Sequence, residues 1–414
     1  MKILVQKFGG TSVATQERRE MIVDKVEAAL KNGYFPVVVV SAIGRSGDPY
    51  ATDTLINMAK SVGIETNPRE MDLLMACGEI ISSVVMANTL KKRGYECAAL
   101  TGAQAGIITD DNFGDAEVLR VDTQKIYKYI ENNIIPVITG FQGVNENGDI
   151  TTLGRGGSDV SGSIIGEALN AEAVEIYTDV EGVMTADPRI VPDARVMKTI
   201  YYNEVFQMAE YGANVIHPRA VEVAMRSNIP LVIRNTMSNS PGTLITNYDK
   251  SRKYKESKKD KIITAVAQIG KRTQVRIFFN GSGGEYEDDN FLFDTIANNH
   301  ISLDMINVYP DSKVFIIEDG QLSKLQKILD GKNISYEFKR NCSKVTIIGN
   351  KMRGVPGVMA KVIRALSKDH IEILQTSDSH TTISCLIASD NVNKAVNALH
   401  QEFELGKVSD KSEK

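Results

Sequence analysis

The stretch "QKFGGTS" (6–12) places a lysine directly before two glycines, at the end of a strand-like segment. Paired glycines let backbone N–H groups approach an anion closely, and Lys7 adds a mobile positive charge. The Walker A pattern and the G-x-G-x-x-G pattern are both absent from the chain. The stretch therefore predicts either an anion-binding loop of another kind or a tight turn.

The stretch "LGRGGSD" (153–159) is more specific. Ser158 and Asp159 stand where an apolar helical pattern begins, and either residue fits the N-cap position. Gly156 and Gly157 would then expose N–H groups at the positive end of a helix. Arg155 can form a bidentate pair with a carboxylate. The pattern favours an anion site, and a structural helix cap with an incidental arginine is the alternative.

Three other stretches carry polar residues that could serve a site. The glycine-rich loop 41–53, with Ser41 and Thr52, follows a buried-strand pattern, where ligands bind in open α/β sheets, but it could also be a plain surface loop. Glu79 lies among small and apolar residues, so it either binds an ammonium group in a pocket or is exposed on a helix. Asp179 and Asp187 either orient a nucleotide or its metal, or form turns.

The first 245 residues alternate strand-like and helix-like segments, which is typical of a parallel sheet covered on both faces. The sequence predicts buried strands at 2–6, 36–42, 98–102, 134–140, 174–179 and 229–235. We therefore expect an α/β catalytic domain over residues 1–247.

The composition changes after this domain. Residues 248–261 are strongly charged, and we expect a solvated linker there rather than a site for an acidic partner. Two weaker units follow, at 262–338 and 339–406, before a polar tail at 407–414. The second unit reads β-α-β-β-α, the start of a ferredoxin-like unit, and the first unit echoes it. A repeated small unit after a catalytic-looking domain indicates regulation rather than chemistry.

The composition excludes several classes of protein. The 414 residues carry a net charge of −4, which argues against nucleic-acid and membrane-surface binding. Four cysteines without a C-x-x-C pair indicate free thiols in a reducing compartment. The histidines lack metal-binding spacing, and no apolar run of about 18 residues predicts a membrane span. We expect a cytoplasmic protein without a metal held by protein side chains.

Taken together, "KFGGTS", "SAIG", "LGRGGSD" and "YTDVEGVMTADPR" resemble the motifs of the aspartate kinases, in the amino acid kinase superfamily. The resemblance extends over essentially the whole chain, and the tail resembles the paired ACT regulatory units of that family. It implies an amino acid kinase fold, an αβα sandwich on a mainly parallel sheet, followed by two ferredoxin-like ACT units.

The resemblance also implies a reaction. The γ-phosphoryl group of ATP would pass to the side-chain carboxylate of L-aspartate, the first step toward lysine, threonine, methionine and diaminopimelate. Mg²⁺ would be held mainly by nucleotide phosphates and water. A homodimer or higher homo-oligomer would bind an amino-acid feedback effector at an ACT interface, and lysine, threonine and diaminopimelate remain open as effectors.

Residue roles follow from the same resemblance. Lys7 and Asp159 would be catalytic, Arg155 would bind the α-carboxylate of aspartate, and Glu79 would bind its α-ammonium group. The other substrate contacts would be Ser41, Thr52, Gly156, Gly157 and Ser158. The nucleotide contacts would be Lys7, Phe8, Gly9, Gly10, Thr178, Asp179, Met184, Thr185, Ala186, Asp187, Pro188 and Arg189.

The chain departs from the family pattern at two places. Asn214 stands where many relatives have a lysine that contacts nucleotide, so this contact is not implied here. The first ACT-like unit reads "NGSGGEYEDDNFLF" in place of a D-x-P-G effector loop. A catalytically dead sensor would be expected to lose Lys7, Arg155 or Asp159, and all three are present. An acetylglutamate kinase would have no ammonium group for Glu79 to bind.

Overall fold

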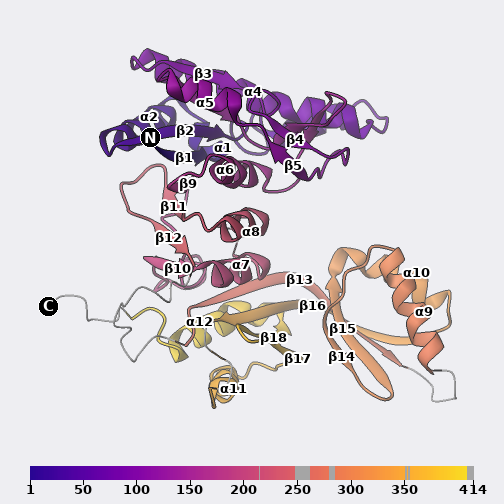
Figure 1. Cartoon of the computed structure of the whole chain (residues 1–414). Helices are drawn as coiled ribbons and strands as arrows, with labels where there is room; N and C mark the ends of the chain where they lie inside the picture. The colour runs from indigo at the N-terminus through magenta and orange to yellow at the C-terminus, as the bar shows by residue number, and fades with distance from the viewer. Residues whose placement is uncertain (214, 248–261, 279–284, 350–351, 353–354, 408–414) are drawn as a thin grey trace. The chain divides into compact units, whose positions relative to one another are not determined.

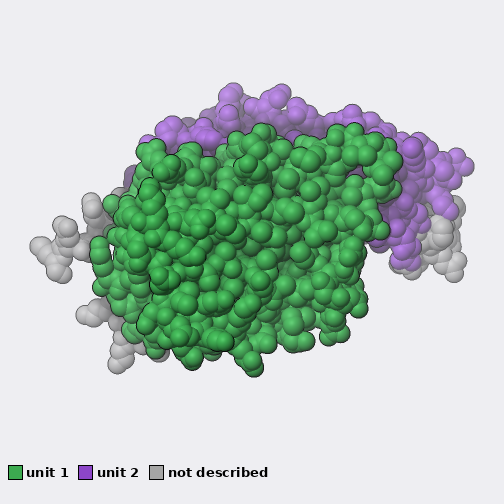
Figure 2. Space-filling view, turned by 90° about the horizontal axis from the view of Figure 1, so that it is seen from above, with its two compact units in different colours: residues 1–183, 196–209, 214–255 green, residues 184–195, 210–213, 256–414 purple. Residues whose placement is uncertain are grey.

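The computed structural model describes residues 1–213, 215–247, 262–278, 285–349, 352 and 355–407. The chain forms two compact units, coloured separately in Figure 2. Unit 1 comprises residues 1–183, 196–209 and 214–255, and unit 2 comprises residues 184–195, 210–213 and 256–414. Unit 2 thus takes two short segments from within the expected catalytic domain. The expected linker, 248–261, and residues 408–414 of the expected tail lie outside the described residues.

Unit 1 is built on an eight-stranded sheet (Figure 1). Its strands are β1 (Lys2–Phe8), β2 (Tyr34–Val40), β3 (Cys97–Leu100), β6 (Ile135–Thr139), β9 (Ala173–Thr178), β10 (Thr199–Tyr201), β11 (Leu231–Asn235) and β12 (Thr243–Thr246). They lie in the order β10-β12-β11-β9-β1-β2-β6-β3, and neighbours are parallel except for β11 and β12. All six strands expected in this region are confirmed. Their β-branched runs are buried, as a sheet covered on both faces requires.

Helices cover both faces of this sheet. On β1, Gln6 faces a cavity beside α2 (Gln16–Lys31). The next residue, Lys7, faces α6 (Gly157–Ala168), where a Cβ built on Gly162 would lie 3.1 Å from the Lys7 Cβ. Because successive strand side chains point to opposite faces, α2 and α6 lie on opposite sides of the sheet (Figure 1). The other helices are α1 (Gly10–Val13), α3 (Thr52–Lys60), α4 (Pro68–Lys92), α5 (Gln124–Glu131), α7 (Tyr202–Glu210) and α8 (Pro218–Ser227). The expected αβα sandwich is confirmed.

A smaller four-stranded sheet completes unit 1. It runs in the order β5-β4-β7-β8, from β4 (Ile107–Thr109), β5 (Val118–Val121), β7 (Gln142–Val144) and β8 (Ile150–Thr152). Strand β8 leads directly into the stretch 153–159, so this sheet positions the glycine-rich turn in front of α6.

Helix α4 is long and apolar enough to cross a membrane by length and composition. Half of its most apolar window is buried inside the protein, however, and its buried positions include Asp72, Glu79, Ser82 and Ser83. A helix with polar residues on its buried side is typical of the core of a domain. We therefore interpret α4 as a core helix of unit 1.

Unit 2 contains one six-stranded sheet in the order β14-β15-β13-β16-β18-β17. Its strands are β13 (Ala265–Phe278), β14 (Asp304–Val308), β15 (Ser312–Glu318), β16 (Ser335–Ile348), β17 (Gln375–Asp378) and β18 (Thr382–Ala388). Its helices are α9 (Glu285–Asn298), α10 (Leu322–Asp330), α11 (Val358–Lys368) and α12 (Val392–Glu402), with short 3₁₀ turns at Asp319–Gln321 and Ser389–Asn391.

The two halves of unit 2 share their central strands. The first part of β13 pairs with the last part of β16, and after a register shift the rest of β13 pairs with the beginning of β16. The pairing of β15 with β13 is confined to the second part of β13, and the pairing of β18 with β16 is confined to the second part of β16. Two separate hydrophobic clusters follow from this arrangement. The boundary expected between residues 338 and 339 falls inside β16, because each long strand serves both halves.

Candidate functional site

Lys7 and Asp159 form an ion pair at the centre of unit 1. Lys7 lies near the end of β1, and its Nζ is 2.5 Å from Oδ1 of Asp159, in the first turn of α6. Lys7 is 7% exposed. Gly162, one turn further along α6, leaves room for the lysine stem. The structure therefore brings together the two residues expected to be catalytic, from elements more than 140 residues apart in the chain.

The glycines after Lys7 permit close approach of backbone segments. The Gly9 N–H donates to the carbonyl of Tyr177 at 3.1 Å, and the Gly44 N–H donates to the carbonyl of Gly10 at 3.0 Å. A Cβ on Gly10 would lie 2.5 Å from the Gly44 oxygen, so a larger residue would push the loop after β2 away. The Gly9 N–H is thus engaged by β9, as fits the tight turn that the sequence left open as the alternative to an anion-binding loop.

The stretch before α6 depends on Gly156. This residue has φ of 69° and is the N-cap of α6, and a Cβ on it would lie 2.2 Å from Cγ of His217. The expectation that Ser158 or Asp159 caps the helix is wrong. The helix begins at Gly157, one residue earlier, so Asp159 lies within its first turn, where its carboxylate pairs with Lys7. Gly157 and Ser158 pack against Phe141 and Gly140, respectively.

Glu79 is a buried carboxylate on α4. It is 2% exposed, and its Oε1 accepts a hydrogen bond of 3.0 Å from the Ala42 N–H. Its Oε2 is buried without a hydrogen-bond partner in the structure. Burial raises the pKa of Glu79 to about 8, although the N–H of Ala42 and the charge of Lys7 act in the opposite direction. Burial disfavours the charged form of this carboxylate, and one of its oxygens has no hydrogen-bond partner. A bound cation would offset the first and satisfy the second.

The raised pKa makes stability depend on pH. Between the ordinary pKa of 4.5 and about 8, the folded chain binds more protons at Glu79 than the unfolded chain does. The stabilisation is complete below about 4.5 and is lost as pH rises to about 8. We expect the Tm of the ligand-free chain to fall over this range, and to fall less in Glu79→Gln, as measured by scanning calorimetry. Glu65→Gln, at an exposed glutamate just before α4, is the control. Parallel curves for the parent chain and Glu79→Gln would contradict this assignment.

A second buried carboxylate, Asp72, bonds the end of the strand that leads into the glycine-rich stretch 153–159. Asp72 is fully buried on α4 and accepts hydrogen bonds from the backbone N–H and hydroxyl of Thr152, at 2.7 and 2.8 Å, and from the Gly114 N–H at 2.9 Å. Thr152 ends β8, and Arg155 follows three residues later. Helix α4 is thereby connected to the strand that leads to Arg155. The sequence analysis missed Asp72, whose only signal was an acidic residue in an apolar helical stretch.

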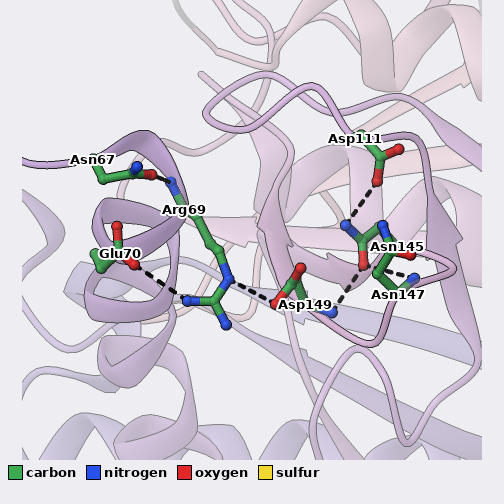
Figure 3. A network of polar contacts seen from close by, with 7 residues as sticks. All are labelled: Asn67, Arg69, Glu70, Asp111, Asn145, Asn147 and Asp149. Carbon is green, nitrogen blue, oxygen red and sulfur yellow. Dashed lines mark hydrogen bonds and ion pairs between the residues drawn. The ribbon is translucent and has the colours of Figure 1, made fainter.

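Polar contacts at the start of α4 extend this support (Figure 3). Asn67 caps the helix. The guanidinium of Arg69 lies between two carboxylates, donating to Asp149 at 2.7 Å and to Glu70 at 3.2 Å. Asn145 bonds Asp111 and also accepts the N–H of Asp149, which closes the turn between β7 and β8. Exposed ion pairs of this kind contribute little free energy individually. Together they fix the position of the hairpin that precedes the site.

The remaining expected contacts in unit 1 lie at strand ends around this centre. Ser41 continues from β2 and donates its N–H to the Phe8 carbonyl, and Thr52 begins α3. Phe8 stacks on Tyr177 at 4.7 Å between ring centroids. Thr178 ends β9, and the next residue, Asp179, pairs with Arg45, a loop residue that the sequence analysis did not single out. Arg155 is exposed and has no ion pair among the described residues.

The other nucleotide contacts expected from the sequence, Met184–Arg189, belong to unit 2. Asp187 accepts hydrogen bonds from the backbone and side chain of Arg189, which lower its pKa. Asn214 lies outside the described residues. Within the described residues, no group of three or more histidine, cysteine, aspartate or glutamate side chains is arranged to hold a metal ion.

Comparisons with known proteins agree with this architecture. The amino acid kinase family model matches residues 2–235, and an ACT domain model matches residues 337–401. Aspartokinase 1 of Bacillus subtilis is 44% identical over 98% of this chain and 100% of its own length. The aspartokinase of Geobacillus stearothermophilus is 38% identical over 98% of each chain.

A solved structure shows the same fold. The crystal structure of E. coli aspartokinase III in complex with aspartate and ADP matches with a TM-score of 0.79 over 97% of this chain and 99% of that one, at 24% identity. Because this match covers nearly all of both chains, the two folds are alike in both the kinase part and the ACT part. This chain therefore belongs to the aspartokinases of the amino acid kinase family.

Proposed function

We propose that this chain transfers the γ-phosphoryl group of ATP to the side-chain carboxylate of L-aspartate, giving 4-phospho-L-aspartate. The observation that carries the proposal is the buried Glu79 carboxylate with its unpartnered oxygen, in a site that also holds the Lys7–Asp159 pair. An amino acid with a free α-ammonium group would satisfy this oxygen. Membership among the aspartokinases identifies which amino acid it is.

Aspartate is bound at its two charged backbone groups. Glu79 receives the α-ammonium group, and Arg155 pairs with the α-carboxylate through charge-assisted hydrogen bonds. Ser41, Thr52, Gly156, Gly157 and Ser158 surround the substrate. The exposed position of Arg155 supports this role, because its guanidinium has no competing ion pair among the described residues. The side-chain carboxylate of aspartate then points toward Lys7.

The chemistry requires few functional groups. The attacking carboxylate is already ionised near neutral pH, so the reaction needs no general base. The site must bring two anions together and stabilise the charge that develops during transfer. Lys7 supplies this stabilisation, and Asp159 holds the lysine ammonium in place. Phe8, Gly9, Gly10, Thr178, Asp179 and Met184–Arg189 hold the nucleotide. Mg²⁺, which would be held mainly by nucleotide phosphates and water, would neutralise charge on the phosphates.

Arg155→Ala is expected to raise KM for aspartate by about 10- to 150-fold, because a hydrogen bond to a charged group contributes about 1.5–3 kcal/mol. The value of KM for ATP should change little. Steady-state kinetics with either substrate varied would measure both constants. Arg120→Ala, at an exposed arginine on β5, is the matched control. An unchanged KM for aspartate would show that the α-carboxylate lies elsewhere.

A substrate panel tests the proposed function. ADP release with MgATP would be measured for L-aspartate, L-glutamate, N-acetyl-L-aspartate and N-acetyl-L-glutamate. We expect efficient turnover with L-aspartate alone, because acetylation removes the charge that Glu79 binds. Faster turnover with either acetylated acid would contradict the proposal.

Regulation and assembly complete the proposal. The ACT domain implies allosteric control, and we propose that unit 2 binds an amino-acid end product, with the chain acting as a homodimer or higher homo-oligomer. The proposed location is the cytoplasm, where ATP is available and the four free cysteines would stay reduced.

A further inference from the structure

The segment Met184–Arg195 is built into the interior of unit 2. Ala186 and Val191 are buried in the hydrophobic cluster that also contains Val266 of β13 and Leu399 of α12. The first half of this segment, Met184–Arg189, supplies some of the nucleotide contacts proposed above. Part of the proposed ATP site therefore has its packing partners in the regulatory unit.

Thr185 is bonded through both its backbone and its side chain. It is 1% exposed, its N–H donates to the Arg195 carbonyl at 3.0 Å, and its carbonyl accepts from the Val266 N–H at 2.9 Å. Its hydroxyl oxygen accepts the Arg195 N–H at 3.2 Å and lies 3.0 Å from Nε2 of His400. His400, on α12, is 2% exposed. The imidazole thus connects α12 to the bend that precedes Asp187.

The Thr185 hydroxyl is held by His400 together with the Arg195 N–H. A hydroxyl has one donor and two acceptor sites, and the Arg195 N–H uses one acceptor site. The remaining donor and acceptor sites allow a bond to either tautomer of His400. Two further bonds attach the segment to the same region: Asn397 Nδ2 donates to the Ile190 carbonyl at 2.9 Å, and Arg195 Nε donates to the Leu405 carbonyl at 2.8 Å. Helix α12 and the turn after it therefore hold the beginning, middle and end of the segment.

We propose that His400 is a positioning residue for ATP, which holds Thr185 and so keeps the backbone of Met184–Arg189 in its nucleotide-binding conformation. The proposal rests on the proposed function for the role of this segment. It adds a residue of the ACT part to the determinants of ATP affinity. It also implies that a rearrangement of α12 changes the affinity for ATP more than the affinity for aspartate, because Glu79 and Arg155 belong to unit 1.

A purely structural role for His400 would lower stability without separating the two substrates. The test therefore compares KM for ATP with KM for aspartate in the full chain, for His400→Leu, His400→Gln, Thr185→Val and Thr185→Ser. His400→Leu and Thr185→Val remove the bond, and we expect each to raise KM for ATP by about tenfold, with kcat and KM for aspartate within about twofold of the parent. His400→Gln and Thr185→Ser keep a polar partner and should retain most of the affinity. His370→Leu, at an exposed histidine of unit 2, is the control.

A double variant separates the bond from unrelated effects. Thr185→Val with His400→Leu should be no worse for ATP than either single change, because both remove the same interaction. Calorimetric titration with a non-hydrolysable ATP analogue and Mg²⁺ measures nucleotide affinity apart from turnover. If aspartate is not phosphorylated by the parent chain, the proposed function fails, and this titration still decides the role of His400. Unchanged nucleotide affinity in Thr185→Val and His400→Leu, or an equal rise in KM for both substrates, would overturn the proposal.

Discussion

Replacing Lys7 by methionine is expected to lower kcat by about 100- to 1,000-fold, the range found when one charge-stabilising donor is removed from an active site. The physical reason is the position of the ammonium group. It is buried at the end of β1 and held 2.5 Å from Asp159, so its charge is poorly screened by water. Methionine has a similar length and apolar stem, so packing against Gly162 should be preserved.

The control for this change lies on the same strand. Lys2 is exposed at the beginning of β1, and Lys2→Met should leave kcat unchanged. Rapid-quench measurement of a single turnover would show whether the chemical step itself is slowed. If Lys7→Met changed only KM for ATP and left the chemical step intact, Lys7 would serve binding rather than catalysis.

The second large effect is expected at Glu79. Glu79→Gln should raise KM for aspartate by about 30-fold or more, because breaking a buried charged pair costs about 2–5 kcal/mol. The value of kcat/KM for aspartate in the parent chain should also rise with pH up to about 8, since only the ionised carboxylate attracts the α-ammonium group. The glutamine variant, which cannot ionise, should lack this rise.

Glu65→Gln is the control, because Glu65 is an exposed glutamate just before the same helix. It should alter neither KM nor the pH profile. A Glu79→Gln variant with normal KM for aspartate would place the ammonium group elsewhere. A profile of kcat/KM that stayed flat between pH 6 and 9, values chosen to bracket the pKa of about 8, would contradict the ionisation assigned to Glu79.

The strands of unit 1 could be predicted from the sequence because each strand carries its own local apolar pattern. Runs such as "PVVVV" in β2 are apolar on both sides of the strand, which only a sheet covered on both faces tolerates. The order of strands in unit 2 could not be predicted in this way. It depends on the register between β13 and β16, which lie about 70 residues apart, and on a register shift in the middle of both.

The site residues show the same difference between features that the local sequence determines and features that depend on distant contacts. Lys7 and Asp159 were identified through motif resemblance, and the structure places them in contact. The sequence left Glu79 open between an exposed and a buried position, because burial depends on Ala42 and the loop after β2. Asp72 was missed for a similar reason, since its hydrogen-bond donors, Thr152 and Gly114, come from distant parts of the chain. The cap of α6 was misplaced because the left-handed backbone of Gly156 is invisible in the residue pattern.

The most direct test of the central claim is trapping of the acyl phosphate. The full chain would be incubated with MgATP, L-aspartate and hydroxylamine, and the hydroxamate would be quantified beside ADP and identified by mass spectrometry. Our account predicts aspartate β-hydroxamate in equal amount to ADP, none without aspartate, and at least about 100-fold less with Lys7→Met over the same time. ADP release without hydroxamate, or hydroxamate formed from N-acetyl-L-glutamate in place of aspartate, would contradict it.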